Sequence, residues 1–389
     1  MNVTPLAVHS PRALRDVLRA HGWDDGQAGT AASGIHSLAF HLTGLDQGTL
    51  EALVRLSGSL GLEVVTGSDW AILAGSRSRL SAFARPWLVP ETLASAATAV
   101  GLAMPAEPVT AWRTARGVVP LDRPVVVGIL NLTPDSFSDG GRFAGLDAAL
   151  ARADQLLESG ASVLDLGGES TRPGRTEPVP ADEERARVVP VVEALTRRHP
   201  GVVVSVDTVK ASVARAALEA GAAAINDVSA LRLDPAMASV VAAAGAGLVL
   251  MHSRGSILEI ASYTHAVYAD VVAEVIGELR EALALASAAG VAQDSTVLDP
   301  GLGFSKTVEQ NILLFDRLEA FQALGRPVLV GPSRKRFLGA VTGQPVEARD
   351  QATATACALA WERGARLFRV HDAESARDAL ALAHAIGGP

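Results

Sequence analysis

The chain has 389 residues, of which 49% are hydrophobic and 20% charged, so it can bury a large core and is not intrinsically disordered as a whole. Its 34 basic and 42 acidic residues give a formal net charge of −8, which argues against nucleic-acid or anionic-membrane partners held by bulk electrostatics. A single cysteine, Cys357, excludes a disulfide framework and a Cys-based zinc site; with no signal peptide or bilayer-length apolar run recognisable, we expect a cytoplasmic protein.

The first part of the chain, residues 1–116, differs in pattern from the rest. It predicts a strand, a helix with an aspartate cap, two short strands and a second helix, over residues 36–45, 46–61, 62–66, 70–74 and 78–87. This order is typical of a small α+β domain with an antiparallel sheet. We find no cluster of acids, bases or metal ligands in it and expect it to supply no catalytic groups. Residues 88–123 contain four prolines and are predicted to connect it to the remainder.

From residue 117 onward the pattern is a regular alternation of strands and helices. Apolar runs that predict buried strands occur at residues 125–132, 162–167, 202–206, 223–228, 247–251, 296–298, 327–330 and 367–370. Each is followed by an amphipathic stretch. Continuously apolar strands separated by helices indicate a parallel sheet, and eight such units in about 260 residues favour a closed (β/α)₈ TIM barrel. A doubly wound sheet is the alternative, but no glycine-rich dinucleotide motif follows any strand.

Polar residues recur at the carboxyl ends of these strands, where barrels of this class build their active sites. One set can hydrogen-bond the amide and amidine edges of a flat heterocycle, and it comprises Asp207, Asn226, Asp299 and Lys335. A second set suits a phosphate or diphosphate, and it comprises Asn131, Arg172, Arg369 and His371. Because buried polar groups are costly unless they are satisfied, a rim this polar indicates a polar ligand.

Oxygen donors after the first strand indicate a magnesium ion. Asn131, with Asp135 or Asp139, offers the hard ligands that magnesium shares with phosphate oxygens and water. The Gly- and Pro-rich segments after strands one and two are long for such loops, and we expect both to close over substrate.

Only three of the basic residues are lysines: Lys210, Lys306 and Lys335. Each lysine is either present by chance in a chain whose basic residues are mostly arginine, or it stands where a compact ammonium is needed and a guanidinium would not serve. Position favours the second explanation for Lys335, whereas Lys306 stands at the start of a helix and is expected to tolerate arginine better. His252, alone at a strand end, is more typical of a hydrogen-bonded structural residue than of a base.

Seven motifs carry a resemblance to a known family. In chain order they are GILNLTPDSFSDGG, LDLGGESTRPG, SVDT, IND, DPGLGF, SRK and RVHD, and together they resemble the dihydropteroate synthases of folate biosynthesis. The resemblance spans about residues 125–386. It implies a TIM barrel, usually homodimeric, that joins 6-hydroxymethyl-7,8-dihydropterin diphosphate to 4-aminobenzoate and releases 7,8-dihydropteroate and pyrophosphate. The partners are then small molecules, not nucleic acid or membrane.

The resemblance also implies roles for individual residues. Asp207, Lys335, Arg369 and Asp139 would act in catalysis, and the pterin would be held by Asp207, Asn226, Asp299, Lys335 and Phe304. The diphosphate would contact Thr171, Arg172, Arg369 and His371, and Asn131 would bind Mg²⁺. Phe137 and Pro173 would help to wall the aminobenzoate pocket. Arg336 stands where many members carry a small hydroxyl residue near the aminobenzoate carboxylate.

Two other functions share parts of this pattern. A pterin-binding methyltransferase would use the heterocycle pocket without a diphosphate site, and the intact first and last motifs argue against it. A degenerate, non-catalytic homologue would have lost residues such as Asn131, Asp207, Lys335 or Arg369, all of which are present. A chain that begins near residue 118 would keep all eight predicted strands, so we expect it to fold and remain active.

Overall fold

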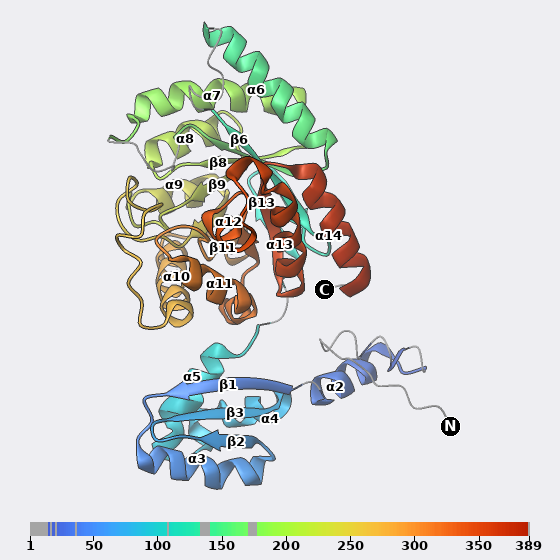
Figure 1. The fold of residues 1–389 in the computed structure, drawn as a ribbon, viewed down its shortest axis with the longest axis vertical. Coiled ribbons are helices and arrows are strands. Elements are labelled where there is room, and N and C mark those ends of the chain that lie inside the picture. The colour runs from blue at the N-terminus through green and yellow to red at the C-terminus, as the bar shows by residue number, and fades with distance from the viewer. Residues whose placement is uncertain are drawn as a thin grey trace. The chain divides into compact units, whose positions relative to one another are not determined.

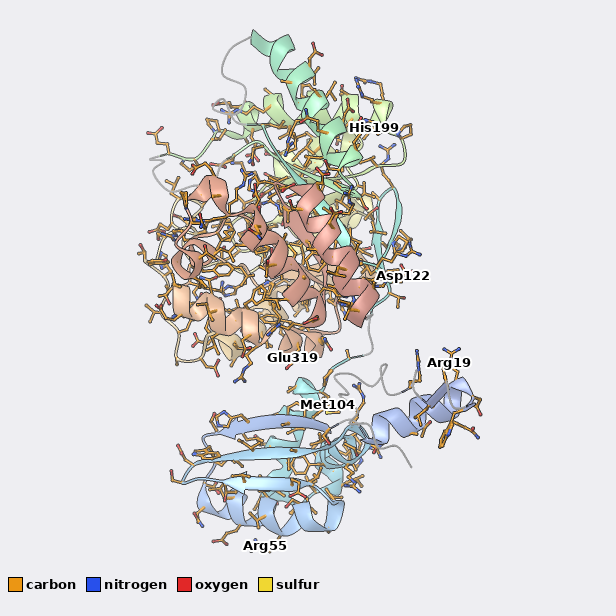
Figure 2. The ribbon with its side chains drawn as sticks, turned by 45° about the vertical axis from the view of Figure 1, so that its right-hand side comes forward. Arg19, Arg55, Met104, Asp122, His199 and Glu319 are labelled. Atoms are coloured by element: carbon orange, nitrogen blue, oxygen red, sulfur yellow. The ribbon has the colours of Figure 1, made fainter. Side chains whose placement is uncertain are left out.

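The computed structural model describes residues 15, 18–19, 22–35, 37–106, 109–132, 141–169 and 177–387. The chain separates into two compact units, Met1–Pro105 and Ala106–Pro389, whose ribbons and side chains are drawn in Figures 1 and 2. None of the helices in the described ranges combines the length and apolar character needed to span a bilayer.

The first unit contains a three-stranded antiparallel sheet with helices on it. Its elements are α2 (Asp25–Ile35), β1 (Ser37–Thr43), α3 (Gln47–Leu60), β2 (Glu63–Thr66), β3 (Trp70–Ser76), α4 (Arg77–Phe83), the 3₁₀ turns η1 (Pro86–Leu88) and η2 (Glu91–Leu93), and α5 (Ala94–Ala103). The strand order is β1-β3-β2. Helix α3 begins where the Asp46 side chain accepts a 2.7 Å hydrogen bond from Thr49 N, and it ends at Gly61 in the left-handed region. The core of this unit is formed by Leu53, Leu73, Leu80, Phe83 and Leu93.

Residues 88–123, which we expected to be a connecting segment, instead contain regular structure. They include α5 and a hairpin of β4 (Ala111–Thr114) and β5 (Gly117–Pro120). Three of the prolines that suggested a linker, Pro90, Pro105 and Pro120, stand between or at the ends of these elements, where the missing N–H does no harm. Helix α5 has the sequence ASAATAVGLA, which is too uniformly apolar to show an amphipathic period.

The β4–β5 hairpin belongs to the second unit, so the division falls after Pro105 and not at residue 116, where we placed it from the sequence. Trp112 on β4 is fully buried, and its indole Nε1 donates a 2.9 Å hydrogen bond to Ser295 O. It packs in one cluster with strand residues that include Val127, Val163 and Val249. Because this cluster lies at the amino-terminal part of the barrel strands, the hairpin closes that end of the barrel.

Eight parallel strands form a closed barrel, as the sequence pattern predicted. They are β6 (Val125–Asn131), β7 (Val163–Gly167), β8 (Val203–Asp207), β9 (Ala224–Asp227), β10 (Gly247–Met251), β11 (Thr296–Asp299), β12 (Val328–Val330) and β13 (Ala365–Val370). Nearly every strand residue is buried, because side chains on one face fill the barrel and those on the other pack under helices. β13 pairs with β6 and closes the ring.

The outer layer of the barrel consists of helices that follow the strands (Figure 1). They are α6 (Gly141–Glu158), α7 (Ala181–Arg198), α8 (Ala211–Glu219), α9 (Met237–Ala244), α10 (Val271–Ala288), α11 (Val308–Asp316), α12 (Arg336–Thr342), α13 (Asp350–Glu362) and α14 (Ala373–Gly387), with 3₁₀ turns η4 (Gln293–Ser295), η5 (Leu318–Leu324) and η6 (Val346–Ala348). The short α12 follows β12 directly and was not predicted. It matters because it begins one residue after Lys335.

Candidate active site

The register of the barrel strands places three predicted site residues, Asn131, Asp207 and Asn226, in one row with Gly167. Asn131 pairs with Gly167, Gly167 with Asp207, and Asp207 with Asn226. A Cβ atom at Gly167 would lie 3.8 Å from Asn131 Oδ1 and 3.9 Å from Asp207 Cβ. The glycine therefore leaves the space between the amide and the carboxylate open at the carboxyl ends of β6, β7 and β8.

Arg369 joins carboxylates from two other strands at the centre of the barrel. Its Nε donates to Asp165 Oδ2 over 2.6 Å, and its Nη2 donates to Asp207 Oδ2 over 2.9 Å. Asn226 Nδ2 donates to the same Asp165 oxygen over 3.0 Å. The sequence assigned Asp207 to a heterocycle and Arg369 to a diphosphate, and the structure shows that these two residues are bonded to each other.

This cluster is buried, and the burial shifts the pKa values of its charged groups. Burial raises the pKa of Asp207 to about 7, although the Arg369 charge acts in the opposite direction. Despite its own burial, the pKa of Arg369 is raised by the charges of Asp165 and Asp207, so the guanidinium stays protonated. A fixed cation between two carboxylates is therefore built into the barrel before any ligand binds.

Three buried polar atoms in this region have no hydrogen-bond partner within the part of the chain that the structure describes. They are Asp165 Oδ1, Ser205 Oγ and Asn226 Oδ1. Their three residues line one small cavity together with Trp112 and hydrophobic strand residues. Since a buried polar atom without a partner is costly, this cavity suits a water molecule or a polar ligand edge.

Lys335 and Phe304 form a second group, at the ends of β12 and β11. The Lys335 ammonium lies 3.5 Å from the centroid of the Phe304 ring, which is a close cation–π contact. Burial, with the charge of Arg369, lowers the pKa of Lys335 to about 7. Burial raises the pKa of Asp299 to about 6, against the hydrogen bond from Gly301 N and the Lys335 charge. An acid and a base with converging pKa values in one site are typical of functional groups.

His371 and Ser333 connect β13 to the segment after β12. The His371 ring nitrogen Nδ1 lies 2.9 Å from Ser333 Oγ, and the backbone N of His371 donates to the same hydroxyl. The histidine predicted to contact diphosphate is therefore oriented by the SRK segment that also carries Lys335. This places the last two motifs of the sequence in one hydrogen-bonded unit.

Lys210 binds two glutamates beside the segment that follows β7. Its ammonium lies 2.5 Å from Glu169 Oε2 and 2.5 Å from Glu184 Oε2. The other Glu169 oxygen accepts a hydrogen bond from Val179 N over 2.8 Å. These contacts tie Glu169 and Val179, which lie on the two sides of this segment, to the start of α8. Lys210 acts here as a structural cation.

Arg336, predicted for the aminobenzoate pocket, is held by the segment after β10. Its Nη2 donates to Ala261 O over 2.7 Å, and its guanidinium carbon lies 4.3 Å from the Tyr263 ring centroid. A contact of this side chain with a substrate carboxylate requires it to leave those partners.

Five of the predicted site residues lie outside the described residues: Phe137, Asp139, Thr171, Arg172 and Pro173. Asp135, the alternative partner for magnesium, lies outside them too.

Within the described ranges, no group of three or more His, Cys, Asp or Glu side chains is placed to hold a metal ion. Asn131 ends β6 half-buried, and its side chain makes no hydrogen bond to any residue that the structure describes. A single hard oxygen donor beside an anion site fits Mg²⁺ that takes its other ligands from diphosphate and water.

Two residues of this region were missed or underrated from the sequence. Asp165 lies within the LDLGGESTRPG motif but was given no role, although a charged residue inside an apolar run is itself a signal. Lys306 was expected to matter less than Lys335, yet it is only 1% exposed and hydrogen-bonded to three groups. It does stand just before helix α11, as predicted, but its side chain turns inward. Its tolerance of arginine stays a prediction, and the burial argues against it.

Comparison with known proteins agrees with this arrangement. A family model described as "Pterin binding enzyme" matches residues 127–371. A dihydropteroate synthase of Bacillus subtilis is 45% identical over 251 residues, which is 64% of this chain and 84% of that protein. The Xanthomonas albilineans dihydropteroate synthase with 4-aminobenzoic acid has a TM-score of 0.64 at 46% identity, covering 69% of this chain and 95% of that one. The structure of that enzyme in complex with 7,8-dihydropteroate has a TM-score of 0.62 at 43% identity, with the same coverage.

The family match covers the barrel strands from β6 to β13, including the ends that carry Asp207, Asn226, Asp299, Lys335 and Arg369. Register and hydrogen bonds bring Asp207, Asn226 and Arg369 together, and the charges of Lys335 and Arg369 both act on Asp299. The chain therefore belongs to the pterin-binding enzyme family, and within it to the dihydropteroate synthases.

Proposed function

We propose that this chain condenses 6-hydroxymethyl-7,8-dihydropterin diphosphate with 4-aminobenzoate to give 7,8-dihydropteroate and pyrophosphate. The observation that carries this proposal is the pairing of Arg369 with Asp207 beside Asn226, in a barrel whose relatives act as dihydropteroate synthases. Buried acceptors and a buried cation at one barrel end suit a ligand that has both a heterocycle and an anionic group.

The reaction exchanges one bond at the pterin methylene carbon. The amine nitrogen of 4-aminobenzoate forms a bond to this carbon as the bond from carbon to the bridging oxygen breaks, and the electron pair leaves with pyrophosphate. The amine gives up one proton, which passes to the released pyrophosphate or to water. Chemistry of this kind requires positioned charges and no protein nucleophile.

The heterocycle is assigned to Asp207, Asn226, Asp299 and Lys335. Carboxylate and amide oxygens accept hydrogen bonds from the amino and ring N–H groups, and the Lys335 ammonium donates to the ring oxygen. The electron-rich ring and the two carboxylates stabilise positive charge that develops at the methylene carbon. The Phe304 ring beneath Lys335 fixes the position of the ammonium.

The leaving group is assigned to Arg369 and His371, with Thr171 and Arg172. Arg369 uses Nε and Nη2 on Asp165 and Asp207, and its remaining N–H groups are available to diphosphate oxygens. Asn131 would hold Mg²⁺ through its amide oxygen, and the ion when bound would neutralise charge on the departing diphosphate. The 4-aminobenzoate pocket is assigned to Phe137, Pro173 and the segment near Arg336.

We extend the proposal to assembly and organisation. Leu359 on α13 and both Leu382 and Ile386 on α14 are apolar and exposed, which supports a homodimer through these helices. Light scattering of the purified chain tests the dimer.

The N-terminal unit is proposed to be a separate α+β domain with its own core, and the enzyme is proposed to be cytoplasmic.

A pyrophosphate-release assay tests the proposed reaction. Release is expected only when the pterin diphosphate and 4-aminobenzoate are both present, with one dihydropteroate formed for each pyrophosphate. Release without 4-aminobenzoate would indicate hydrolysis, and binding of the pterin without release would indicate a non-catalytic homologue.

A further inference from the structure

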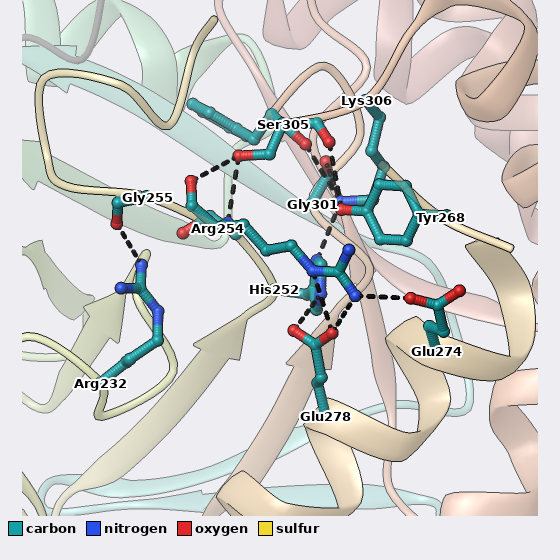
Figure 3. Close-up of polar contacts among 12 residues, drawn as sticks. Arg232, His252, Arg254, Gly255, Tyr268, Glu274, Glu278, Gly301, Ser305 and Lys306 are labelled. Atoms are coloured by element: carbon teal, nitrogen blue, oxygen red, sulfur yellow. Dashed lines mark hydrogen bonds and ion pairs between the residues drawn. The ribbon is translucent and has the colours of Figure 1, made fainter. Parts of the chain in front are cut away.

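A buried ammonium lies beneath the segment that follows β11. Lys306 Nζ lies 3.0 Å from His252 Nδ1, 3.2 Å from Gly301 O and 3.1 Å from Phe304 O (Figure 3). An ammonium has three N–H groups, so each of its donors has one acceptor here. The described chain thus saturates this cation completely, and it has no spare donor for a substrate.

The two carbonyls that Lys306 binds belong to the segment that carries the pterin site. Gly301 N donates to Asp299 Oδ1 over 2.7 Å, so the orientation of that carboxylate depends on the turn at Gly301. Phe304, whose carbonyl is the other acceptor, holds the Lys335 ammonium on its ring. One buried cation therefore fixes both ends of the turn between Asp299 and Phe304.

This turn has an unusual backbone that needs such support. Gly301, Gly303 and Ser305 all have positive φ angles, of 72°, 79° and 47°. A Cβ at Gly303 would lie 2.6 Å from Lys335 Cδ, and a Cβ at Gly301 would collide with His252 O. The turn is packed directly against the residues that it positions, so a small shift in it changes the site.

His252 connects this cation to the outer layer of the barrel. Its Nε2 lies 2.9 Å from Glu278 Oε2, so the neutral ring donates there and accepts from Lys306 at Nδ1. Burial lowers the pKa of His252 to about 4, with the Lys306 charge acting in the same direction, which keeps the ring neutral. Burial also lowers the pKa of Lys306 to about 7, against the charges of Asp299 and Glu278. Figure 3 shows the histidine between the lysine and helix α10.

Lys306, His252 and Glu278 form a hydrogen-bonded network, and Arg254 is its next member. Its Nη2 donates to Glu278 and, over 2.8 Å, to Glu274 Oε2, and its guanidinium lies 3.9 Å from the Tyr268 ring centroid. Tyr268 in turn donates its hydroxyl to Ser305 O over 3.1 Å. The network therefore begins and ends on the same turn, which couples the turn to β10 and α10.

We infer that Lys306, with His252 as its acceptor, is a positioning residue for pterin binding: it locks the turn between Asp299 and Phe304 in the conformation that binds the heterocycle. This inference rests on the proposed function, because it concerns the affinity of the pterin substrate. Neither side chain contacts the substrate; both act through Asp299, Phe304 and Lys335.

A matched pair of substitutions at His252 separates this role from simple packing. In His252→Asn, the amide oxygen takes the place of Nδ1 and still accepts from Lys306. In His252→Gln, the terminal amide takes the place of Nε2 and reaches Glu278, but Lys306 loses its acceptor. Lys306→Met removes all three donors while keeping a side chain of similar length. Glu274→Gln, at the outer end of the network, is the control.

The measurement is the dissociation constant of 6-hydroxymethyl-7,8-dihydropterin diphosphate by calorimetry, with a thermal melt of each variant. We expect His252→Gln to weaken binding by about tenfold, the effect of losing one hydrogen bond to a charged group, and Lys306→Met, which loses three, to weaken binding by at least as much. His252→Asn and Glu274→Gln are expected to bind as the unsubstituted chain does.

Equal weakening by the Asn and Gln variants would overturn the inference, because only one of them keeps the acceptor. So would a Lys306→Met variant that melts cooperatively and binds with unchanged affinity. If the unsubstituted chain binds the pterin but makes no product, the proposed reaction fails, while the positioning role can still be judged from the binding data.

Discussion

Arg369 Nε donates a 2.6 Å hydrogen bond to Asp165 Oδ2, although the two residues are 204 positions apart in the chain. The same guanidinium binds Asp207, so one side chain on β13 holds carboxylates of β7 and β8 together. Because Asp165 is 1% exposed, the bond is made where water cannot replace it.

The first prediction follows from this pair. Arg369→Lys keeps the charge but replaces a planar fork, which has Nε on Asp165 and Nη2 on Asp207, by a single nitrogen, so the hydrogen bond to at least one of the two buried acids is weakened. We expect kcat/KM to fall by about a hundredfold and the free energy of unfolding to fall by about 3 kcal/mol. Steady-state kinetics and urea unfolding measure both. Arg366→Lys, on the same strand outside the site, is the control, and an equal effect of the two variants would refute the assignment.

The second prediction concerns Lys335 and its aromatic partner. Phe304→Leu removes the ring under the ammonium, and we expect the pterin dissociation constant to rise by about tenfold. Lys335→Arg is expected to weaken binding at least as much, because the stem of Lys335 already packs against Gly303 and a larger planar guanidinium would displace it. Phe304→Tyr retains the ring and should bind nearly normally. Unchanged affinity in Phe304→Leu would show that the cation–π contact does not orient Lys335.

The third prediction is a pH dependence of stability. The pKa of Asp299 is raised to about 6, so between about pH 4 and pH 6 the folded chain binds more protons at this site than the unfolded chain. This site therefore lowers the free energy of unfolding as the pH rises through that range. Asp299→Asn removes the contribution, and its stability relative to the unsubstituted chain is expected to increase by about 1–3 kcal/mol from pH 4 to pH 7.

Urea unfolding of the ligand-free protein at several pH values measures this difference. The same variant is expected to lose pterin affinity, since the amide cannot replace a carboxylate as a double acceptor. A difference in stability that stays constant with pH would contradict the raised pKa of Asp299.

The fourth prediction revises the truncation expected from the sequence. A chain that begins at residue 118 lacks β4 and therefore Trp112, which fills the amino-terminal end of the barrel. We now expect that chain to unfold or melt far lower, whereas a chain that begins at residue 106 keeps the hairpin. In the full chain, Trp112→Ala is expected to cost about 3–5 kcal/mol. Differential scanning calorimetry distinguishes these cases, and equal melting of the two truncated chains would refute the role of the hairpin.

The fifth prediction tests the magnesium ligand. Asn131→Ala is expected to raise the Mg²⁺ concentration needed for half-maximal turnover by about tenfold or more, because the ion loses its amide oxygen. Asn131→Asp supplies another hard oxygen and should recover part of the response. A magnesium titration of initial rates measures this, and an unchanged titration curve for Asn131→Ala would assign the ion elsewhere.

The sequence predicted the barrel because its strands are continuous apolar runs and every run is followed by an amphipathic stretch. It also identified Asp207, Asn226, Asp299, Lys335 and Arg369 as neighbours, since the carboxyl ends of parallel strands meet at one end of a barrel. Periodicity could not reveal α5, whose residues are apolar on all sides, or α12, which is only seven residues long.

The hairpin and the Lys306 network were missed for a different reason. Trp112 and Ser295 are 183 positions apart, and Lys306 and His252 are 54 apart, so neither contact leaves a local pattern. A lysine next to a helix cap is usually exposed, and only the packed structure shows that this one turns inward onto two carbonyls. The role of Lys306 therefore depends on its burial in the folded chain, which the local sequence does not reveal.

The most direct test of the account uses pterin diphosphate with ¹⁸O in the oxygen that bridges the methylene carbon and the phosphorus. Incubated with the chain, Mg²⁺ and 4-aminobenzoate, it is expected to give dihydropteroate and pyrophosphate in equal amounts, with the label in the pyrophosphate. That result requires attack of the amine at carbon, as proposed. Label retained on a pterin alcohol, or no dihydropteroate at all, would contradict the assigned reaction.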